Sequence, residues 1–143
     1  MSSGDFSSKD LYGLQCAVRD FDVLLERWKN DPADLALRYS VIKAFELTYE
    51  MSTKTLFKYL KQESFRASEA EGFDFQDLIR LADMEGLLQN GWPKWKLYRE
   101  NRNRTAHVYR EEIAVALTAT LPEFLADAHA VLDSLTRRTE HHA

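Results

Sequence analysis

The strongest constraint on the fold lies between Pro32 and Gln62, where no glycine or proline follows the opening residue. A stretch of about 30 residues without a helix breaker favours one long helix. Two adjacent apolar stripes run along it, the second with a small, hydroxylated middle. They are Leu35, Tyr39, Ile42, Tyr49, Leu56 and Leu60, and Val41, Phe45, Thr48, Ser52, Thr55 and Tyr59. A helix that buries two stripes contacts two or more neighbours, which predicts a helical bundle.

The first and last helices of this bundle are predicted from apolar residues at steps of three and four. The first begins after Ser7 or Ser8, buries a stripe from Leu11 to Trp28 and ends at Asn30-Asp31-Pro32, with Asp31 as the cap of the next helix. The last covers residues 111–138. Pro122 interrupts it, and an interior proline is tolerated where a helix restarts, so we expect a kink or a restart at Thr120.

Two helices are predicted in the middle of the chain. Residues 62–75 are polar and predict a loop. Asp74 caps a short helix, Phe75 to Glu85, whose apolar set includes Met84, and Gly86 ends it. Pro93 opens the next helix, in which Trp92, Trp95 and Tyr98 are expected to anchor the core. With no period-two alternation anywhere, the predicted fold is all-α, an antiparallel up-and-down four-helix bundle with one short extra helix.

Composition bounds the class of protein. With 143 residues, 45% hydrophobic and 29% charged, the chain suits a single domain, 1–143, with frayed ends at 1–8 and 138–143. The net charge of −4 means that a nucleic-acid contact requires a local basic patch. A single cysteine, Cys16, is expected to be buried and fits a cytoplasmic protein, and no apolar run predicts a membrane span. No sequence motif indicates a metal, a cofactor or a phosphate-binding loop.

A cluster of nitrogen bases between Arg99 and Arg110 carries the candidate chemistry. Its centre is RNRTAHVY, residues 102–109. Arg102 would bind a phosphate and His107 would move a proton, for instance from a ribose 2′-OH, while Asn103 would orient either one. Tyr109 would donate a hydrogen bond or accept a modification. Without other information, an ordinary polar stripe is the more frequent explanation of such a run.

Helical geometry adds a condition. At about 100° per residue, Arg102 and Tyr109 share a face, whereas Arg102 and His107 are separated by about 140°. One straight helix would therefore not aim Arg102 and His107 at the same atom. Either the helix is distorted there, or the side chains converge in a groove against another surface, such as a twofold-related copy. Glu46 and Glu50 are also spaced as a pair of acids, but a solvated or lysine-paired face is the expected role.

The motif residues resemble a known family. RNRTAHVY fits the R-x4-H-x-Y signature of HEPN domains (higher eukaryotes and prokaryotes nucleotide-binding), and the closer likeness is to their nucleotidyltransferase substrate-binding branch. Val41 to Leu60 resembles that branch's long second helix, and Trp95 to Tyr109 resembles its signature helix. The apolar tail helix, to about Leu135, is similar in pattern.

The resemblance implies a homodimer, an RNA or nucleotide ligand and a minimal nucleotidyltransferase partner. It implies a toxin of a two-component toxin–antitoxin module, a metal-independent endoribonuclease with Arg102 and His107 catalytic at the dimer cleft and Asn103 supporting. The nucleotidyltransferase would neutralise it, in some systems by transferring AMP to the motif tyrosine, here Tyr109. Arg99 and Arg104 are further candidates for RNA or phosphate binding. The alternatives are a non-catalytic substrate- or nucleotide-binding subunit of the nucleotidyltransferase and a purely structural bundle.

Overall fold

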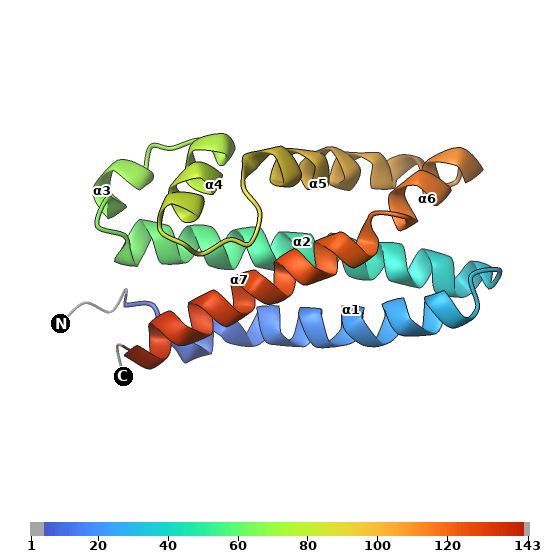
Figure 1. Cartoon of the computed structure of the whole chain (residues 1–143), viewed down its shortest axis with the longest axis horizontal. Coiled ribbons are helices and arrows are strands. Elements are labelled where there is room, and N and C mark those ends of the chain that lie inside the picture. The colour runs from blue at the N-terminus through green and yellow to red at the C-terminus, as the bar shows by residue number, and fades with distance from the viewer. Residues whose placement is uncertain (1–4, 142–143) are drawn as a thin grey trace.

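The computed structural model describes residues 5–141, and its principal helices α1, α2, α5 and α7 run alternately in opposite directions (Figure 1). The helices are α1 (Tyr12–Asn30), α2 (Leu35–Glu63), α3 (Ala67–Ala70), α4 (Phe75–Met84), α5 (Trp92–Arg104), α6 (Glu111–Thr118) and α7 (Leu121–His141), with 3-10 turns η1 (Ser8–Leu11) and η2 (Thr105–His107). The described residues contain no strand. The predicted all-α up-and-down bundle is confirmed.

Helix α1 follows its sequence pattern closely, whereas α2 begins later than predicted. The predicted stripe of α1 is buried between η1 and Leu25, but Cys16 is only partly buried. The N-cap of α2 is Asp34 and not Asp31, because the Asp34 carboxylate accepts a hydrogen bond from the backbone N–H of Leu37 at 3.1 Å. Pro32 consequently lies in the preceding turn.

The first turns of α2 do not bury the apolar residues assigned to them. Leu35 and Tyr39 are 57% and 43% exposed, although the pattern placed them in an inward stripe. Arg38 faces the neighbouring helix at this end, where it pairs with Glu111 of α6 at 3.1 Å. Periodicity located the helix correctly here, but tertiary packing decided which of its faces is covered.

The segment between α2 and α5 contains more structure than a loop. The short helix α3 interrupts the predicted loop and buries Ala70. Helix α4 begins as predicted, with Asp74 accepting from the backbone N–H of Asp77 at 2.9 Å in a capping box. Gly86 adopts φ +75°, the left-handed conformation that ends many helices, just after α4. Met84, predicted to face the core, is 66% exposed.

The predicted restart near Thr120 is present. Helix α6 ends at Thr118, α7 begins at Leu121, and the two helices are bent by 44°. Pro122 is the second residue of α7, where its missing N–H breaks no intrahelical hydrogen bond. Among the described residues, no single helix is both long and apolar enough to cross a membrane, and the bent pair of α6 and α7 passes that test only when its two parts are joined.

The core is centred on the ring of Phe124 in α7. Trp95 and Tyr98 of α5 are fully buried beside it, which confirms their predicted anchoring role, while Trp92 is only partly buried. The ring centroids of Phe45 and Tyr98 lie 5.0 Å from that of Phe124, and those of Trp95 and Phe21 lie 6.0 and 6.1 Å away. Edge-to-face contacts of this kind add to the hydrophobic burial and fix α5 against α7.

The described parts of the two ends are packed, although both were predicted to fray. Phe6 is buried and its ring meets that of Tyr59 edge-on at 5.3 Å. At the other end, Arg138 donates hydrogen bonds to the Tyr59 hydroxyl, at 3.1 Å, and to the carbonyl of Glu85. These contacts hold both ends against α2. The remaining residues predicted to fray, 1–4 and 142–143, lie outside the described residues.

Candidate functional site

The motif lies where α5 ends and the chain turns toward α6. Helix α5 ends at Arg104, and residues 105–107 form the 3-10 turn η2. Val108 is buried, and the backbone N–H of Arg110 donates to the carbonyl of His107 at 3.0 Å, which closes the turn. The helix is therefore distorted between Arg102 and His107, one of the two arrangements that the 140° separation required.

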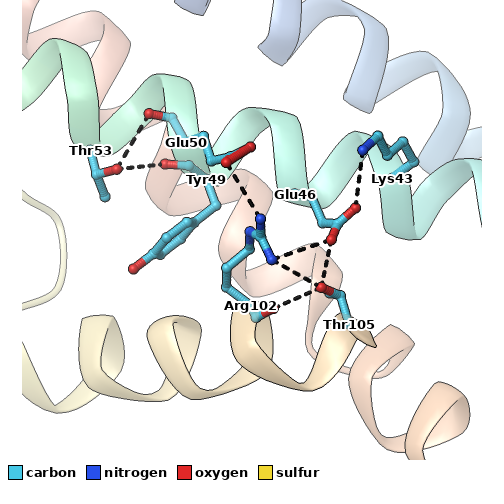
Figure 2. Close-up of polar contacts among 7 residues, drawn as sticks. All are labelled: Lys43, Glu46, Tyr49, Glu50, Thr53, Arg102 and Thr105. Atoms are coloured by element: carbon cyan, nitrogen blue, oxygen red, sulfur yellow. Dashed lines mark hydrogen bonds and ion pairs between the residues drawn. The ribbon is translucent and has the colours of Figure 1, made fainter. Parts of the chain in front are cut away.

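Arg102 in the last turn of α5 is held by two carboxylates of α2, as Figure 2 shows. Its guanidinium lies 3.3 Å from a Glu46 carboxylate oxygen and 3.4 Å from one of Glu50. Thr105 joins Arg102 to Glu46, because its hydroxyl accepts a hydrogen bond from Arg102 at 3.2 Å and donates one to Glu46 at 2.6 Å. The Arg102 side chain is only 32% exposed, so it is fixed and not freely sampling solvent.

Glu46 and Glu50 were expected to form a solvated or lysine-paired face, and the structure shows a further contact of both with the motif. Lys43 does pair with Glu46, at 3.5 Å, as expected of a lysine-paired face. Both glutamates nevertheless contact the candidate catalytic arginine, and Glu46 is largely buried, with 19% of its side chain exposed. Their spacing of four residues indicated one helical face, but only the packing of α5 on α2 shows which side chain that face meets.

Tyr49 lies beside the arginines on the buried side of the site. Burial raises its pKa to about 12, while the positive charges of Arg99 and Arg102 oppose that rise. The neighbouring Thr53 turns its hydroxyl back to the carbonyls of Tyr49 and Glu50, at 3.0 and 3.3 Å (Figure 2). The Tyr49 phenol and the Thr53 hydroxyl are therefore uncharged at neutral pH, and the charge is concentrated at Arg102 and its carboxylates.

His107 and Tyr109 are on the outer side. Both are exposed, Tyr109 to 71%, and their ring centroids lie 6.2 Å apart in an edge-on arrangement. Asn103 is exposed too, and the hydrogen bonds of residues 5–141 do not connect it to His107. An imidazole and a phenol at the surface are accessible to a large substrate or to a modifying enzyme.

Arg104 and Arg99 are positioned by different partners. Arg104 donates to the side-chain carbonyl of the buried Asn101 at 3.2 Å, and Asn101 in turn donates to the Thr120 hydroxyl at 3.0 Å. Arg99 lies over the ring of Phe75, with its guanidinium carbon 4.7 Å from the ring centroid. In residues 5–141, no cluster of three His, Cys, Asp or Glu side chains has the arrangement of a metal site.

Comparison with known proteins identifies the family. Residues 9–137 match the family described as "Nucleotidyltransferase substrate binding protein like". The chain belongs to this branch of the HEPN domain family. A curated relative from Haemophilus influenzae, named "Probable ribonuclease HepT", is 33% identical over 100 residues, which cover 70% of this chain and 68% of the relative.

A solved structure supports the same assignment. A Haemophilus influenzae protein described as having the fold of a substrate binding domain of a nucleotidyltransferase matches with a TM-score of 0.78 and 27% identity. The match covers 86% of this chain and 96% of the other. The HEPN recognition made from residues 41–60 and 95–109 is confirmed, whereas the roles of the individual motif residues stay predictions.

Two residues of this HEPN chain, Thr105 and Glu46, contact Arg102 in a way that the sequence did not predict. Thr105 lies inside the motif at a position that the R-x4-H-x-Y pattern leaves open, yet it joins Arg102 to Glu46. Glu46 lies 56 positions before Arg102, and no local pattern connects them. The sequence offered one indication of this contact: Glu46 is an acid on a face of α2 that a neighbouring helix of the bundle was expected to cover.

Proposed function

We propose that this protein is a HEPN endoribonuclease, the toxin of a two-component module whose antitoxin is a minimal nucleotidyltransferase. The observation that carries the proposal is the fixed guanidinium of Arg102, held by Glu46 and Thr105 at the base of a turn that presents His107 at the surface. The name of the relative, "Probable ribonuclease HepT", supports the same chemistry.

The proposed reaction requires no metal. Arg102 binds the scissile phosphate and stabilises the negative charge that builds on it. His107 takes the proton of the ribose 2′-OH as that oxygen bonds to phosphorus. The bond from phosphorus to the 5′ oxygen breaks, and this oxygen takes up a proton. The products are a 2′,3′-cyclic phosphate and a 5′-hydroxyl end.

We place this chemistry at a cleft between two copies of the chain. His107 is on the exposed side of the motif, while Arg102 is held against α2, so a second surface would complete the enclosure of a substrate. Leu47 and Tyr39, 48% and 43% exposed, lie on the face of α2 next to Glu46, and Tyr109 is 71% exposed. A twofold arrangement would cover these apolar side chains and bring two motifs together.

The same motif explains how a nucleotidyltransferase partner would neutralise the toxin. The phenol of Tyr109 is accessible, and its ring lies 6.2 Å from that of His107. Transfer of AMP from ATP to the phenolic oxygen would release pyrophosphate and leave a phosphodiester beside the motif. That phosphate would compete with RNA for Arg102.

A second candidate function is a non-catalytic subunit that binds a substrate or nucleotide for the nucleotidyltransferase. The family description and the description of the solved relative both favour it. Both candidates use the same arginine, but only the ribonuclease needs His107.

The experiment that separates them is RNA cleavage by the purified full chain, alongside Arg102→Ala and His107→Ala. We expect cleavage by the native protein and a loss of at least about 100-fold in either variant, with unchanged helical content by circular dichroism. Full activity in His107→Ala would reject the mechanism. RNA or nucleotide binding without cleavage in any of the three proteins would establish the binding-subunit alternative.

A further inference from the structure

A second basic feature lies on α2, beyond the motif. Lys54, Lys58 and Lys61 line a groove of about 440 Å³ together with Phe57, Gln62 and Glu71. We call this the lysine groove. It lies where the C-terminal half of α2 approaches the chain around α3 (Figure 1). The structure places it outside the cluster formed by Arg102, Glu46 and Thr105.

Two of the three lysines are available to a ligand. Lys58 pairs with Asp10. In residues 5–141, no carboxylate lies within ion-pair distance of Lys54 or Lys61, and Lys54 is exposed. Glu71 is the single acid among the residues that line the groove. Because Asp10 neutralises Lys58, the groove presents Lys54 and Lys61 against a single acid, Glu71, and it is a local positive site in a chain with net charge −4.

The lysine groove is continuous with the candidate active site along α2. Glu50 contacts Arg102 at 3.4 Å, and Lys54 is one helical turn further on, about 6 Å along the axis. Lys58 and Lys61 follow at further axial steps of about 6 and 4.5 Å. The positive groups therefore extend from the arginine along one face of the helix.

Aromatic rings also connect the lysine groove with the motif helix α5. The ring of Phe57, which lines the groove, meets that of Phe75 edge-on with centroids 5.4 Å apart. The guanidinium of Arg99 lies over the other end of this pair, 4.7 Å from the Phe75 centroid. Arg99 is three residues before Arg102 on α5, so a partly exposed aromatic floor joins the groove to the motif helix.

We propose that the lysine groove binds single-stranded RNA that flanks the scissile phosphate, which rests on the ribonuclease function proposed above. Lys54 and Lys61 contact backbone phosphates, and the Phe57 ring accepts an unstacked base. Proteins that bind single strands without reading sequence combine these two elements, a positive groove for the backbone and aromatic surfaces for bases. The groove thereby extends the RNA site by several nucleotides in one direction.

The composition of the groove favours RNA over an acidic protein surface. Protein interfaces are enriched in aromatic residues and arginine and depleted in lysine. Lysines at intervals of one turn with an aromatic ring between them instead match a chain of regularly spaced phosphates that carries planar bases. A protein ligand is the alternative outcome of the test below.

The test uses the full chain with His107→Ala, so that RNA is bound but not cut. The probe is a fluorescent oligouridylate of about 20 nucleotides, compared with one of about 4 nucleotides. Affinity is measured over a range of salt concentrations. For single strands the salt dependence falls by about 0.7 for each lost phosphate contact. The variant is Lys54→Glu/Lys61→Glu.

The matched control is Arg27→Glu/Lys29→Glu. These exposed residues lie near the C-terminal end of α1, at the other end of the molecule from α3, and the substitution changes the net charge by the same amount. We expect the groove variant to bind the long oligonucleotide about tenfold more weakly, with its salt slope reduced by about 1.4, and the short one almost normally. The control should keep the original slope with both probes.

Two results would overturn the proposal. One is a groove variant that matches the control in affinity and slope. The other is loss of co-purification with the nucleotidyltransferase while RNA binding is unchanged, which would make the groove a protein-docking surface. Cleavage of the long oligonucleotide by the native chain is scored separately. If that cleavage is absent but the salt slope changes as expected, the ribonuclease function fails and the RNA-binding groove remains.

Discussion

The guanidinium of Arg102 and the carboxylate of Glu46 lie 3.3 Å apart, although 56 positions separate the two residues in the chain. Thr105 closes the arrangement by hydrogen-bonding to both. The carboxylate competes with a phosphate for the arginine, but it also determines where the guanidinium lies. Because Glu46 is largely buried and contacts three side chains, those of Lys43, Arg102 and Thr105, we infer that positioning outweighs competition.

This relationship predicts that Glu46→Ala lowers RNA cleavage about tenfold, which corresponds to about 1.4 kcal/mol of transition-state stabilisation. Glu50→Ala is the matched control, because it removes the same charge from the same helix and the same arginine. Glu50 is 52% exposed, and we expect its loss to change cleavage by no more than about twofold. Initial rates on one RNA substrate measure both.

Glu46→Gln refines this test. The amide keeps an acceptor for Arg102 and Thr105 while removing the charge, so we expect activity between that of the native protein and Glu46→Ala. If Glu46→Gln and Glu46→Ala both cleave faster than the native chain, the carboxylate restrains the arginine, and the positioning role is wrong.

A hydrogen bond between Tyr98 and Asp127 holds α5 against α7. The hydroxyl of Tyr98 donates to Asp127, a carboxylate that is 1% exposed and that also accepts from Asn90 at 2.9 Å. We expect Tyr98→Phe to lower the free energy of unfolding by about 1–3 kcal/mol, because a buried carboxylate loses a donor. Urea unfolding measures this. Tyr109→Phe, at an exposed phenol, should leave the stability unchanged, and equal stability of all three proteins would contradict the network's importance.

The longer helices of the fold were predictable because each has a local signal, whereas the short helix α3 lay in a segment predicted to be a loop. Three examples of such local signals are the breaker-free sequence of α2, the Asp74 cap and the restart before Pro122. Each of these signals determines the conformation of residues only a few positions away. The errors occur where long-range packing decides. Leu35 and Tyr39 fit an apolar stripe, yet they are 57% and 43% exposed. Arg138 was assigned to a frayed end, yet it reaches Tyr59 and Glu85.

The residues of the candidate site also fall into two groups, those that the sequence identified and those that only the packing shows. Arg102, His107 and Tyr109 form a linear pattern that a resemblance identifies. Glu46 and Thr105 have no such pattern, because their role comes from the contact of α5 with α2. The spacing of Arg102 and His107 left two arrangements open, a distorted helix or a groove against another surface, and η2 shows that the helix is distorted.

Burial of Tyr49 predicts a loss of stability at alkaline pH. Its pKa is about 12 in the folded protein, against about 10 in the unfolded chain. A raised pKa favours folding below pH 10, and the contribution is lost as the pH rises from about 10 to 12, where the unfolded chain has released a proton that the folded one retains. The loss amounts to about 2–3 kcal/mol.

The measurement is urea unfolding of the native protein and Tyr49→Phe at intervals between pH 9 and 11. Phenylalanine has no proton to release, so the stability difference between the two proteins should shift in favour of the variant as the pH rises. Tyr109→Phe is the control, since the Tyr109 side chain is 71% exposed. Parallel curves for native and Tyr49→Phe proteins would show that Tyr49 titrates alike in both states.

The exposed phenol of Tyr109 predicts a change in mass in the presence of the proposed nucleotidyltransferase partner. Expressed with its nucleotidyltransferase, the chain should gain one or more AMP units, because the hydroxyl is accessible and the ring lies beside His107. Intact-mass spectrometry of the protein expressed alone and with the partner measures this. Tyr109→Phe should show no added mass. Tyr39→Phe, at a phenol that is 43% exposed, should be modified normally. If an AMP adduct persists in Tyr109→Phe, the acceptor is another residue. If the native chain is unmodified and the partner still suppresses its RNA cleavage, the partner neutralises the proposed toxin by binding alone.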